Sequence, residues 1–424
     1  RPLYILEKLI VLKLRKYQKE AVASVYKWAK NNIGNPCIVM PTGTGKTVVI
    51  AKLCEDAVRW GKRVLILSHV KELLEQSFHT LKEIDPTLDV GLYSAGLKRK
   101  DCHNKVLCAG IQSVYNHSDD VGFFDLIIID EAHLIPMRGE GMYLTFLEKQ
   151  MEGNLRLRVC GLTATPYRMD SGNICGEENI FQEVAYTVRI EKMIEEGWLC
   201  PLVNRSGKTD VDFNALHVRA GEFVSSEVDT LMTKNTAAMV SDMFFKTKDR
   251  HSILIFASSI AHADMIAEEL RTRTTDPVGV ITGTTDSETR RSIIESFKGA
   301  GVKEHIFEET PPIRYLVNVG VLTTGFDAPN IDAVVLARPT ASTGLYVQMV
   351  GRGLRLHESK KDCLILDYGE NILRHGPIDD LFVRPNHEKH DFQKKAPLKV
   401  CPKCGAYSSL SASECVECGE RFEI

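Results

Sequence analysis

The stretch VMPTGTGKTVV at residues 39–49 contains the residue types that bind phosphate groups. Its order of apolar run, glycine-bearing turn and second apolar run predicts a strand, a tight loop and a helix, so that backbone N–H groups face the phosphates. Lys46 would reach the β- and γ-phosphate oxygens, and Thr47 would offer its hydroxyl to Mg²⁺. The other loop residues expected to contact the nucleotide, ATP, are Thr42, Gly43, Thr44 and Gly45.

Met40 stands where the strict pattern G-x-x-x-x-G-K-[ST] has its first glycine. A residue that ends a buried strand can point its side chain into the core. We therefore expect the loop to keep its phosphate-binding shape, with Gly43 and Gly45 at the two tight backbone positions.

Two carboxylates follow the apolar run FDLIIID. Asp130 would hold Mg²⁺ opposite Thr47, and Glu131 would orient and deprotonate the attacking water. Carboxylates at a strand end can instead cap a helix, so the pair alone leaves both interpretations open. Together with Lys46, the two carboxylates predict hydrolysis of ATP.

Four cysteines near the C-terminus have the spacing C-x2-C-x10-C-x2-C. Each C-x2-C turn can aim two thiolates at one ion, and four soft ligands suit tetrahedral Zn²⁺. We expect a structural zinc site that folds a small ribbon attached to the main body, so that zinc removal leaves ATPase activity largely intact. Contact of this ribbon with DNA, with a partner or only with the preceding domain stays open. The ligands are Cys401, Cys404, Cys415 and Cys418.

The elements that position these residues follow a βαβ rhythm. Near-continuous apolar runs such as RVLILS (63–68) alternate with helix-like stretches up to about residue 200, and the rhythm returns with SILIFAS at 252–258. Such runs predict parallel sheets buried on both faces. We expect an α/β fold of two doubly wound lobes and a zinc ribbon, with domains at residues 1–205, 206–390 and 396–424. A surface insertion is expected at 298–312 and a linker at 384–399.

The composition is that of a globular protein and argues against a membrane protein. The chain has 424 residues, 44% of them hydrophobic and 26% charged, which is typical of a globular protein of more than one domain. No run approaches the roughly 18 apolar residues of a membrane span. The net charge of −3 gives no overall attraction to nucleic acid, although local patches can still bind phosphates. Eight scattered cysteines fit a reducing compartment, so we expect a cytoplasmic protein.

MPTGTGKT, DEAH, LTATP (162–166), VGVLTTGFDAP (319–329) and QMVGRGLR (348–355) resemble the ordered motifs of superfamily 2 helicases and translocases. The resemblance implies two RecA-like lobes with ATP between them. It also implies that Arg352 and Arg355 reach the phosphates from the second lobe, since guanidinium groups suit a phosphoryl transition state. A surface ion pair is the alternative for these arginines.

The same resemblance assigns further roles. Arg15 and Gln18 in LRKYQ resemble the adenine-reading element, although a plain helix start is the alternative. Gly325 and Asp327 would contact the nucleotide from the second lobe. The residues expected to couple the nucleotide site to the nucleic-acid track are His133, Thr163, Thr165 and Gln348.

LSHVKELLEQ (67–76), GLKRKDCHNKVLCAGIQSV (96–114) and DCLILDYGEN (362–371) are similar to the bacterial RadD family of DNA-dependent repair ATPases. This resemblance implies DNA, single-stranded or branched, as partner, and with it association with the nucleoid. It also implies repair and recombination proteins such as single-strand DNA-binding protein as further partners. Charged runs are usually solvated faces, so the basic run LKRK is ambiguous. The expected nucleic-acid contacts are Gln76, Lys98, Arg99, Gln112, Ser113 and Thr323.

Three other functions share these motifs. An RNA helicase would grip the nucleic-acid backbone with the same residues. A restriction-type motor subunit resembles this core too, although no nuclease carboxylate cluster is evident in the sequence. An adaptor that binds DNA and only switches conformation with ATP is the third alternative.

Overall fold

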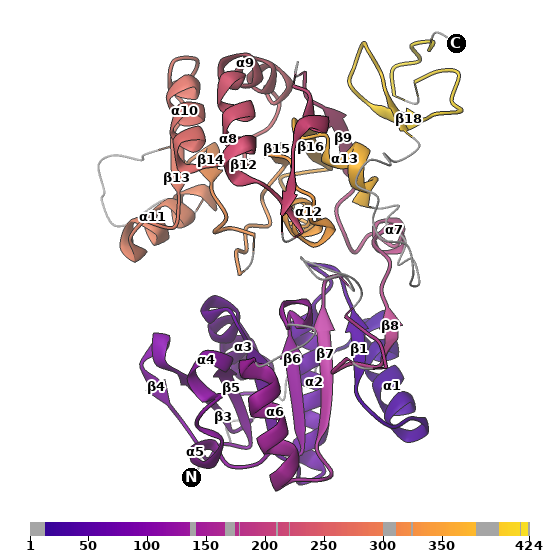
Figure 1. Ribbon diagram of the computed structural model, residues 1–424, viewed down its shortest axis with the longest axis vertical. Helices are drawn as coiled ribbons and strands as arrows, with labels where there is room; N and C mark the ends of the chain where they lie inside the picture. Colours follow the sequence, from indigo (N-terminus) through magenta and orange to yellow (C-terminus); the bar gives the residue numbers. More distant parts are fainter. Residues whose placement is uncertain are drawn as a thin grey trace, which may run out of the picture. The chain divides into compact units, whose positions relative to one another are not determined.

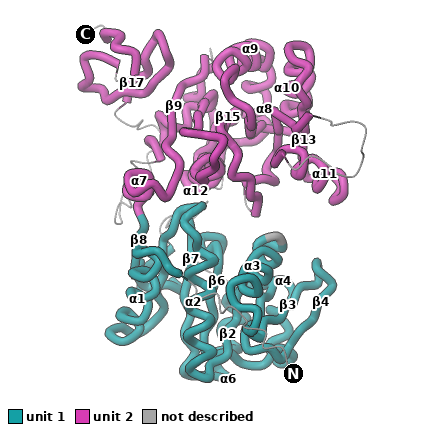
Figure 2. Tube along the Cα trace, turned by 180° about the vertical axis from the view of Figure 1, so that it is seen from behind, with its two compact units in different colours: residues 1–168, 173–188 teal, residues 169–172, 189–424 magenta. Residues whose placement is uncertain are grey.

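The computed structural model describes residues 13–135, 141–165, 174–177, 179–208, 211–219, 221–299, 311–323, 325–378, 398–415 and 417–422. The chain divides into two compact units, residues 1–168 with 173–188 and residues 169–172 with 189–424 (Figure 2). Most of the expected insertion at 298–312 and of the expected linker at 384–399 lies outside the described residues. Among the described residues, no helix has the length and apolar character needed to cross a membrane.

The first unit contains an eight-stranded sheet in the order β4-β3-β5-β2-β6-β7-β1-β8, in which every pairing except β3 with β4 is parallel (Figure 1). Its elements are α1 Lys16–Asn31, β1 Pro36–Val39, α2 Lys46–Arg59, β2 Val64–Ser68, α3 Lys71–Ile84, β3 Val90–Ser94, η1 Ala95–Leu97, β4 Arg99–Lys100, β5 Val106–Gly110, α4 Ile111–Val114, α5 Ser118–Val121, β6 Leu126–Asp130, η2 Ala132–Leu134, α6 Met142–Gly153, β7 Arg158–Thr163 and β8 Glu183–Thr187.

Helices cover both faces of this sheet. α2 contacts both α1 and α3, whereas α6 contacts α4 and α5, so the helices form two separate groups. Alternate residues of β2, such as Leu65 and Leu67, join the core beside Phe146 and Leu147 of α6, while Ile66 between them is equally buried. Burial on both faces is what the continuous apolar runs predicted.

The second unit contains a six-stranded parallel sheet in the order β13-β14-β12-β15-β16-β9. Its elements are α7 Ile190–Glu195, β9 Leu202–Ser206, η3 Phe213–Ala215, β10 Val218–Arg219, β11 Glu222–Phe223, α8 Ser225–Lys234, α9 Thr236–Lys246, β12 Ile253–Ala257, α10 Ile260–Arg271, β13 Val278–Ile281, α11 Ser287–Phe297, β14 Tyr315–Asn318, β15 Ala333–Ala337, α12 Thr343–Val350, β16 Cys363–Asp367, α13 Asn371–His375, β17 Leu398–Val400 and β18 Tyr407–Ser409.

The structure corrects the expected boundary between the first two domains. Residue 205 lies inside β9, and β9 pairs with β16 of the second sheet through Leu202–Cys363 to Ser206–Asp367. The compact units meet at residues 188 and 189 instead. The fold class expected from the sequence, two doubly wound parallel-sheet lobes, is confirmed.

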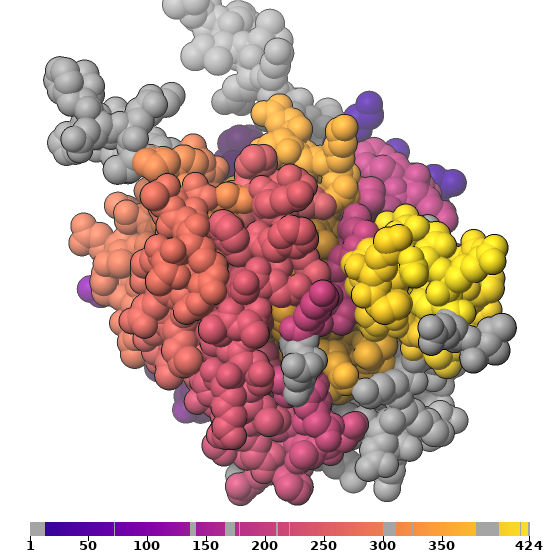
Figure 3. All heavy atoms as spheres, turned by 90° about the horizontal axis from the view of Figure 1, so that it is seen from above, coloured from indigo at the N-terminus to yellow at the C-terminus, as the bar shows by residue number. Residues whose placement is uncertain are grey.

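The C-terminal ribbon belongs to the second compact unit and contains the two-stranded antiparallel sheet of β17 and β18. In the space-filling view its yellow atoms lie directly against other atoms of that unit (Figure 3). β18 contacts β9, the edge strand of the six-stranded sheet. Of the alternatives that the sequence left open, the structure therefore shows contact with the preceding lobe.

All twelve cysteines of the chain are free of disulfides. Outside the C-terminal array, every cysteine is buried except Cys102, which is partly exposed after β4. Free, buried thiols behave as small apolar side chains.

Candidate functional site

The phosphate-binding loop connects the carboxyl end of β1 to the first residue of α2. Gly43 and Gly45 have φ values of 86° and 78°, in the left-handed region that glycine adopts without strain. Met40 is fully buried, and its N–H donates to the carbonyl of Thr163 at 2.8 Å. The expectation that Met40 points into the core while the loop keeps its glycine turns is confirmed.

The adjacent strands β6, β7 and β1 bring three motifs to one edge of the first sheet. Val39 pairs with Thr163, and Asp130 pairs with Leu162, so the loop, the carboxylates and the Thr163 segment all follow neighbouring strand ends. In doubly wound sheets, ligands bind at the carboxyl ends of the strands. Thr47, in the first turn of α2, and Asp130 are therefore suited to hold Mg²⁺.

The start of α1 packs onto the phosphate-binding loop. The Tyr17 hydroxyl and the Gln18 Nε2 both donate to the Thr44 carbonyl, at 2.9 and 3.1 Å, and the Gln18 Oε1 accepts from the Arg15 N–H at 2.9 Å. A Cβ at Gly45 would lie 2.7 Å from the Gln18 Nε2, so glycine permits this close approach. Sequence reasoning missed this clamp and the part of Tyr17 in it, because a plain K-Y-Q string carries no sign of the carbonyl it meets.

Lys46 and Glu131 form an ion pair, with the Lys46 Nζ 3.0 Å from the Glu131 Oε1. Each side chain is only 12% exposed. Glu131 has φ 50° and ψ 50°, a left-handed conformation that a glutamate rarely adopts and that turns its side chain out of the line of β6. Strain of this kind is common at functional sites.

Asp130 is buried beside this pair. Burial and the neighbouring Glu131 carboxylate raise the pKa of Asp130 to about 6, and Lys46 offsets part of that increase. A buried carboxylate with a raised pKa gains when a divalent cation compensates its charge, so the donor chemistry fits Mg²⁺.

His133 connects Glu131 to the Thr163 segment. Its Nδ1 lies 2.9 Å from the Thr163 Oγ1 and 3.4 Å from the Glu131 Oε2. The Thr163 hydroxyl donates to the Thr165 carbonyl at 2.8 Å, so its oxygen accepts from His133, and Nδ1 carries the hydrogen. Burial lowers the pKa of His133, which keeps the ring neutral. The predicted coupling residues His133, Thr163 and Thr165 are thus in contact.

In the second unit, Arg352 is buried against the backbone. It is 6% exposed, and its guanidinium donates to the carbonyls of Thr323, at 2.7 Å, and Phe326, with a weaker 3.4 Å contact to the carbonyl of Gln348. These contacts join the TTGFDAP segment to the end of α12. Sequence reasoning did not foresee this backbone-holding arrangement.

Arg355 is held differently. It forms an ion pair with Asp327 and a 3.3 Å hydrogen bond to the Phe326 carbonyl. Burial lowers the pKa of Arg355, partly offset by Asp327, and the group remains a cation. Gly325 has φ 69° in the same turn. The predicted residues Thr323, Gly325, Asp327, Arg352 and Arg355 are thus gathered in one segment of the second unit.

The expected nucleic-acid contacts follow the carboxyl ends of β2, β3 and β5 in the first unit. Gln76, Lys98 and Gln112 are exposed, and the Gln112 Nε2 donates to the His69 carbonyl at 3.3 Å. The Ser113 Oγ accepts from the Ala95 N–H at 3.0 Å. Arg99 pairs with Asp101 at 2.6 Å and lies over the Phe78 ring, so it has intramolecular partners already.

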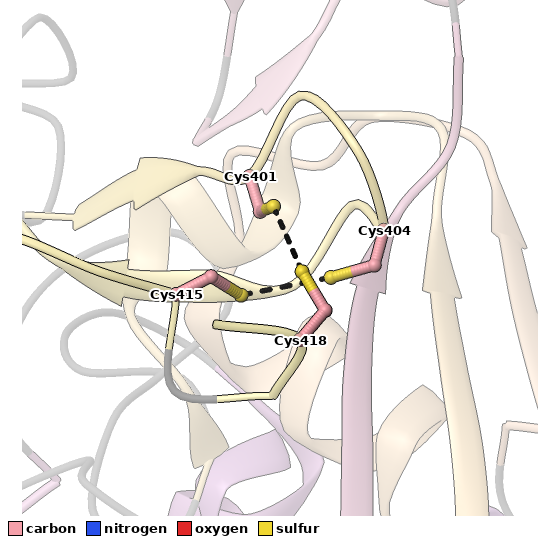
Figure 4. A group of neighbouring side chains, drawn as sticks. All are labelled: Cys401, Cys404, Cys415 and Cys418. Carbon is pink, nitrogen blue, oxygen red and sulfur yellow. Dashed lines mark hydrogen bonds between the residues drawn. The ribbon is translucent and has the colours of Figure 1, made fainter. Parts of the chain in front are cut away.

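The four C-terminal cysteines point toward one another (Figure 4). All four Sγ atoms lie within 4.8 Å of one another, and the pairs Cys401–Cys418 and Cys404–Cys415 are each 3.6 Å apart. Tetrahedral Zn–S bonds of about 2.3 Å require sulfur separations of roughly 3.8 Å, whereas a disulfide needs about 2 Å. The geometry therefore fits a Zn²⁺ ion.

Known proteins match both units. The family model "Type III restriction enzyme, res subunit" matches residues 11–168, and "Helicase conserved C-terminal domain" matches residues 235–357. A Saccharomyces cerevisiae protein named as an ATP-dependent helicase, IRC3, is 30% identical over 84% of this chain and 51% of its own length. A Schizosaccharomyces pombe protein named as a mitochondrial ATP-dependent helicase, irc3, is 30% identical over 86% of this chain and 58% of its own length.

This chain thus spans about half the length of those relatives. Among solved structures, a fragment described as an HsdR subunit of a type I restriction enzyme from Vibrio vulnificus YJ016 matches with a TM-score of 0.61 at 24% identity, covering 87% of this chain and 66% of that one. This last likeness supports the fold alone. With both helicase domains matched in order and their motif residues gathered at the strand ends, the chain belongs to the superfamily 2 helicases.

Proposed function

We propose that this chain is a nucleic-acid-dependent ATPase that translocates on or remodels DNA. The main support for this proposal is the ion pair between Lys46 and Glu131 at the end of the phosphate-binding loop. The loop has the glycine turns, at Gly43 and Gly45, that phosphate binding requires. When ATP binds, its phosphate oxygens would replace Glu131 as the partner of Lys46. Glu131 would then be able to accept a proton from the attacking water. Mg²⁺ held by Thr47 and Asp130 would neutralise phosphate charge.

Coupling to nucleic acid would pass through His133. Its Nδ1 lies close to both the Glu131 carboxylate and the Thr163 hydroxyl, so a shift of the Thr163–Thr165 segment would change the surroundings of the proposed base. From the second unit, Arg355 would exchange Asp327 for the phosphates, while Gln348 and Arg352 hold the segment that carries it. Hydrolysis would then need residues of both units.

We propose DNA as the substrate on the resemblance of stretches such as 67–76, 96–114 and 362–371 to the RadD repair ATPases; the matched family models identify only the wider helicase class. Repair or recombination is the corresponding process.

The test is ATP turnover with single-stranded, duplex and forked DNA and with matched RNA, using Glu131→Gln as the control for contaminating ATPases. DNA is expected to stimulate ATP turnover. If only RNA stimulates turnover, RNA and not DNA is the substrate. If DNA affinity depends on the nucleotide but no turnover occurs, the protein is an adaptor.

A restriction-type motor is the second candidate, favoured by the family model that matches residues 11–168. In that case this chain would work beside a nuclease domain. Incubation of plasmid with the protein and Mg·ATP distinguishes the two candidates, because the repair ATPase is expected to leave the plasmid backbone intact.

We propose Zn²⁺ as the ligand of Cys401, Cys404, Cys415 and Cys418, in a structural role. The free thiols fit a reducing compartment. We do not propose association with the nucleoid, since one relative is named as mitochondrial. Contact with single-strand DNA-binding protein is left out as well, because none of the described residues supports it.

A further inference from the structure

The outer edge of β9 is covered by the C-terminal ribbon. β9 is the last strand of the six-stranded sheet, so one side of its backbone is not paired with another strand of that sheet. The Ser206 N–H donates to the Gly405 carbonyl at 2.8 Å, and Arg205 forms an antiparallel bridge with Ala406. The Arg205 guanidinium also lies 3.1 Å from the Glu417 carboxylate. Main-chain pairing of this kind protects an edge strand.

The main-chain partners of β9 are Gly405, the last residue of the first metal knuckle (residues 401–405), and Ala406, which follows it, whereas Glu417 lies in the second knuckle. Inside the knuckle, the Gly405 N–H donates to the Cys401 carbonyl at 2.9 Å, and the Cys401 N–H donates to the Ala406 carbonyl at 2.8 Å. The fully buried core of the ribbon consists of Cys401, Ala406 and Cys415. A core this small does not fold without its metal.

On its inner side, β9 is hydrogen-bonded to the end of β16. Ser206 pairs with Asp367, and the Gly207 N–H donates to the Asp367 carbonyl at 2.7 Å. The Asp367 carboxylate accepts from the N–H groups of Gly369 and Ile372 and from the Asn371 Nδ2, at 2.7–2.9 Å. This single buried carboxylate therefore fixes the start of α13.

α13 in turn supports α12, the helix that precedes Arg352 and Arg355. The Asn371 Oδ1 accepts from the Thr340 N–H at 2.8 Å, just before α12. The Tyr346 hydroxyl donates to the Gly376 carbonyl at 3.0 Å, and its ring stacks on His375. A continuous set of hydrogen bonds thus runs from the metal knuckle through β9, β16 and α13 to α12, the helix that precedes the two arginines.

We propose that metal occupancy of the four cysteines controls the order of this part of the second unit. With the metal bound, the first knuckle holds the β9 edge. Without the metal, the knuckle unfolds, the edge is released, and α13 and α12 loosen. The inference rests on the proposed metal site but not on ATPase activity, and it replaces the expectation of an independent appendage.

Hydrogen exchange of the full chain, loaded with Zn²⁺ and then stripped by a chelator, tests the proposal. Exchange in peptides covering 202–207 and 363–376 is expected to accelerate at least about tenfold on metal removal, whereas peptides of β1 and β6 in the first unit stay unchanged. Faster exchange confined to 398–422 would overturn the inference, because the ribbon would then unfold alone. A full chain that binds no Zn²⁺ would refute the metal site itself.

Two glycines provide matched variants that keep all four thiols. Gly405 and Gly419 each follow a C-x2-C pair and have φ values of 74° and 70°, so alanine strains both backbones alike. A Cβ at Gly405 would lie 2.9 Å from the Ser206 carbonyl oxygen, whereas a Cβ at Gly419 meets nothing within 4 Å. In Zn²⁺-loaded protein, with metal content confirmed by a chelating dye, Gly405→Ala should accelerate exchange in 202–207 and Gly419→Ala should not. Equal exchange in the two variants would contradict the coupling.

Discussion

At the scale of single residues, Glu131 combines a left-handed backbone with a hydrogen-bonded ion pair to Lys46. A general base contributes about 10²- to 10⁴-fold to a rate. We expect Glu131→Gln to lower ATP turnover by a factor in this range while ATP binding is retained, as measured by steady-state turnover and by titration with a nucleotide analogue. Glu55→Gln, on the surface of α2, serves as control, and turnover within a few-fold of wild type in Glu131→Gln would remove Glu131 as the base.

Asp130 is expected to lower the stability of the folded protein while it supports ATP turnover. Its folded pKa of about 6 lies above the ordinary value of 3.8, so ionisation costs folding free energy. Well below pH 3.8 both states are protonated and the cost is absent. The cost grows as pH rises from about 4 to about 6 and is then constant. We expect Asp130→Asn to raise the stability of the metal- and nucleotide-free protein by about 3 kcal/mol at pH 7.5, with a gain that shrinks toward pH 4, while turnover is lost.

Denaturant unfolding at both pH values measures this gain. The Asn side chain can still accept from the Glu131 N–H, as Asp130 does at 2.9 Å, so no hydrogen bond is lost. A gain that is equal at pH 4 and pH 7.5 would show that ionisation of Asp130 is not its cause.

The two arginines after α12 are expected to have different roles: Arg352 mainly stabilises the fold, and Arg355 mainly supports catalysis. Arg352 is buried on the carbonyls of Thr323 and Phe326, whereas Arg355 pairs with Asp327, whose side chain is 46% exposed. Arg352→Ala should therefore cost about 2–4 kcal/mol of stability, because the Thr323 carbonyl loses its donor and the Phe326 carbonyl keeps only the longer bond from Arg355. Arg355→Ala should cost less, about 1 kcal/mol, because its partner Asp327 is 46% exposed and can be solvated, yet it should abolish turnover. Thermal unfolding and turnover assays on both variants test this, and equal destabilisation would contradict the assignment.

At this scale the sequence predicted which residues gather but not all their contacts. Motif spacing correctly grouped Lys46 with Glu131 and His133 with Thr163, because strand-end loops of a parallel sheet meet at one edge. It could not show that Arg352 spans two backbone carbonyls, since carbonyl directions depend on the tertiary path of residues 323–326. The Tyr17 hydroxyl escaped notice for the same reason.

At the scale of elements, the start of α1 grips the phosphate-binding loop through one carbonyl, that of Thr44. Tyr17→Phe and Gln18→Ala each remove one bond to it. We expect Tyr17→Phe to weaken ATP and GTP binding equally, because it loosens the loop alone. Gln18→Ala should reduce ATP binding more than GTP binding, because Gln18 is also proposed to read adenine.

Equilibrium binding of both nucleotides to both variants measures this difference. If the two variants lose ATP and GTP affinity in the same ratio, Gln18 acts only as a clamp and does not read the base.

Several interior strands were predictable from sequence, whereas the edge strands β8 and β9 were not. RVLILS, FDLIIID and SILIFAS correspond to β2, β6 and β12, which are buried throughout except at Leu126 of β6. β8 (EVAYT) and β9 (LVNRS) are only partly buried, so polar residues interrupt them and no continuous apolar run marks them. The misplaced domain boundary at residue 205 follows directly from overlooking β9.

At the scale of the whole molecule, each unit has its own buried core. We therefore expect a fragment of residues 13–188 to fold and to bind an ATP analogue, while ATP hydrolysis is absent because Arg355 belongs to the other unit. Circular dichroism, analogue titration and turnover assays on the fragment test this. Turnover comparable to the full chain would show that the first unit suffices for catalysis.

The burial of its cysteines gives this protein a natural labelling position. Seven of the eight thiols outside the C-terminal array are enclosed in the two cores, and a bound ion would shield the four in the array. Cys102 is left as the accessible nucleophile, next to Asp101 and Arg99 beyond β4. A maleimide fluorophore should therefore attach at this one site in the unmutated chain, beside the surface proposed to meet DNA, and report arrival of a strand as a change in emission.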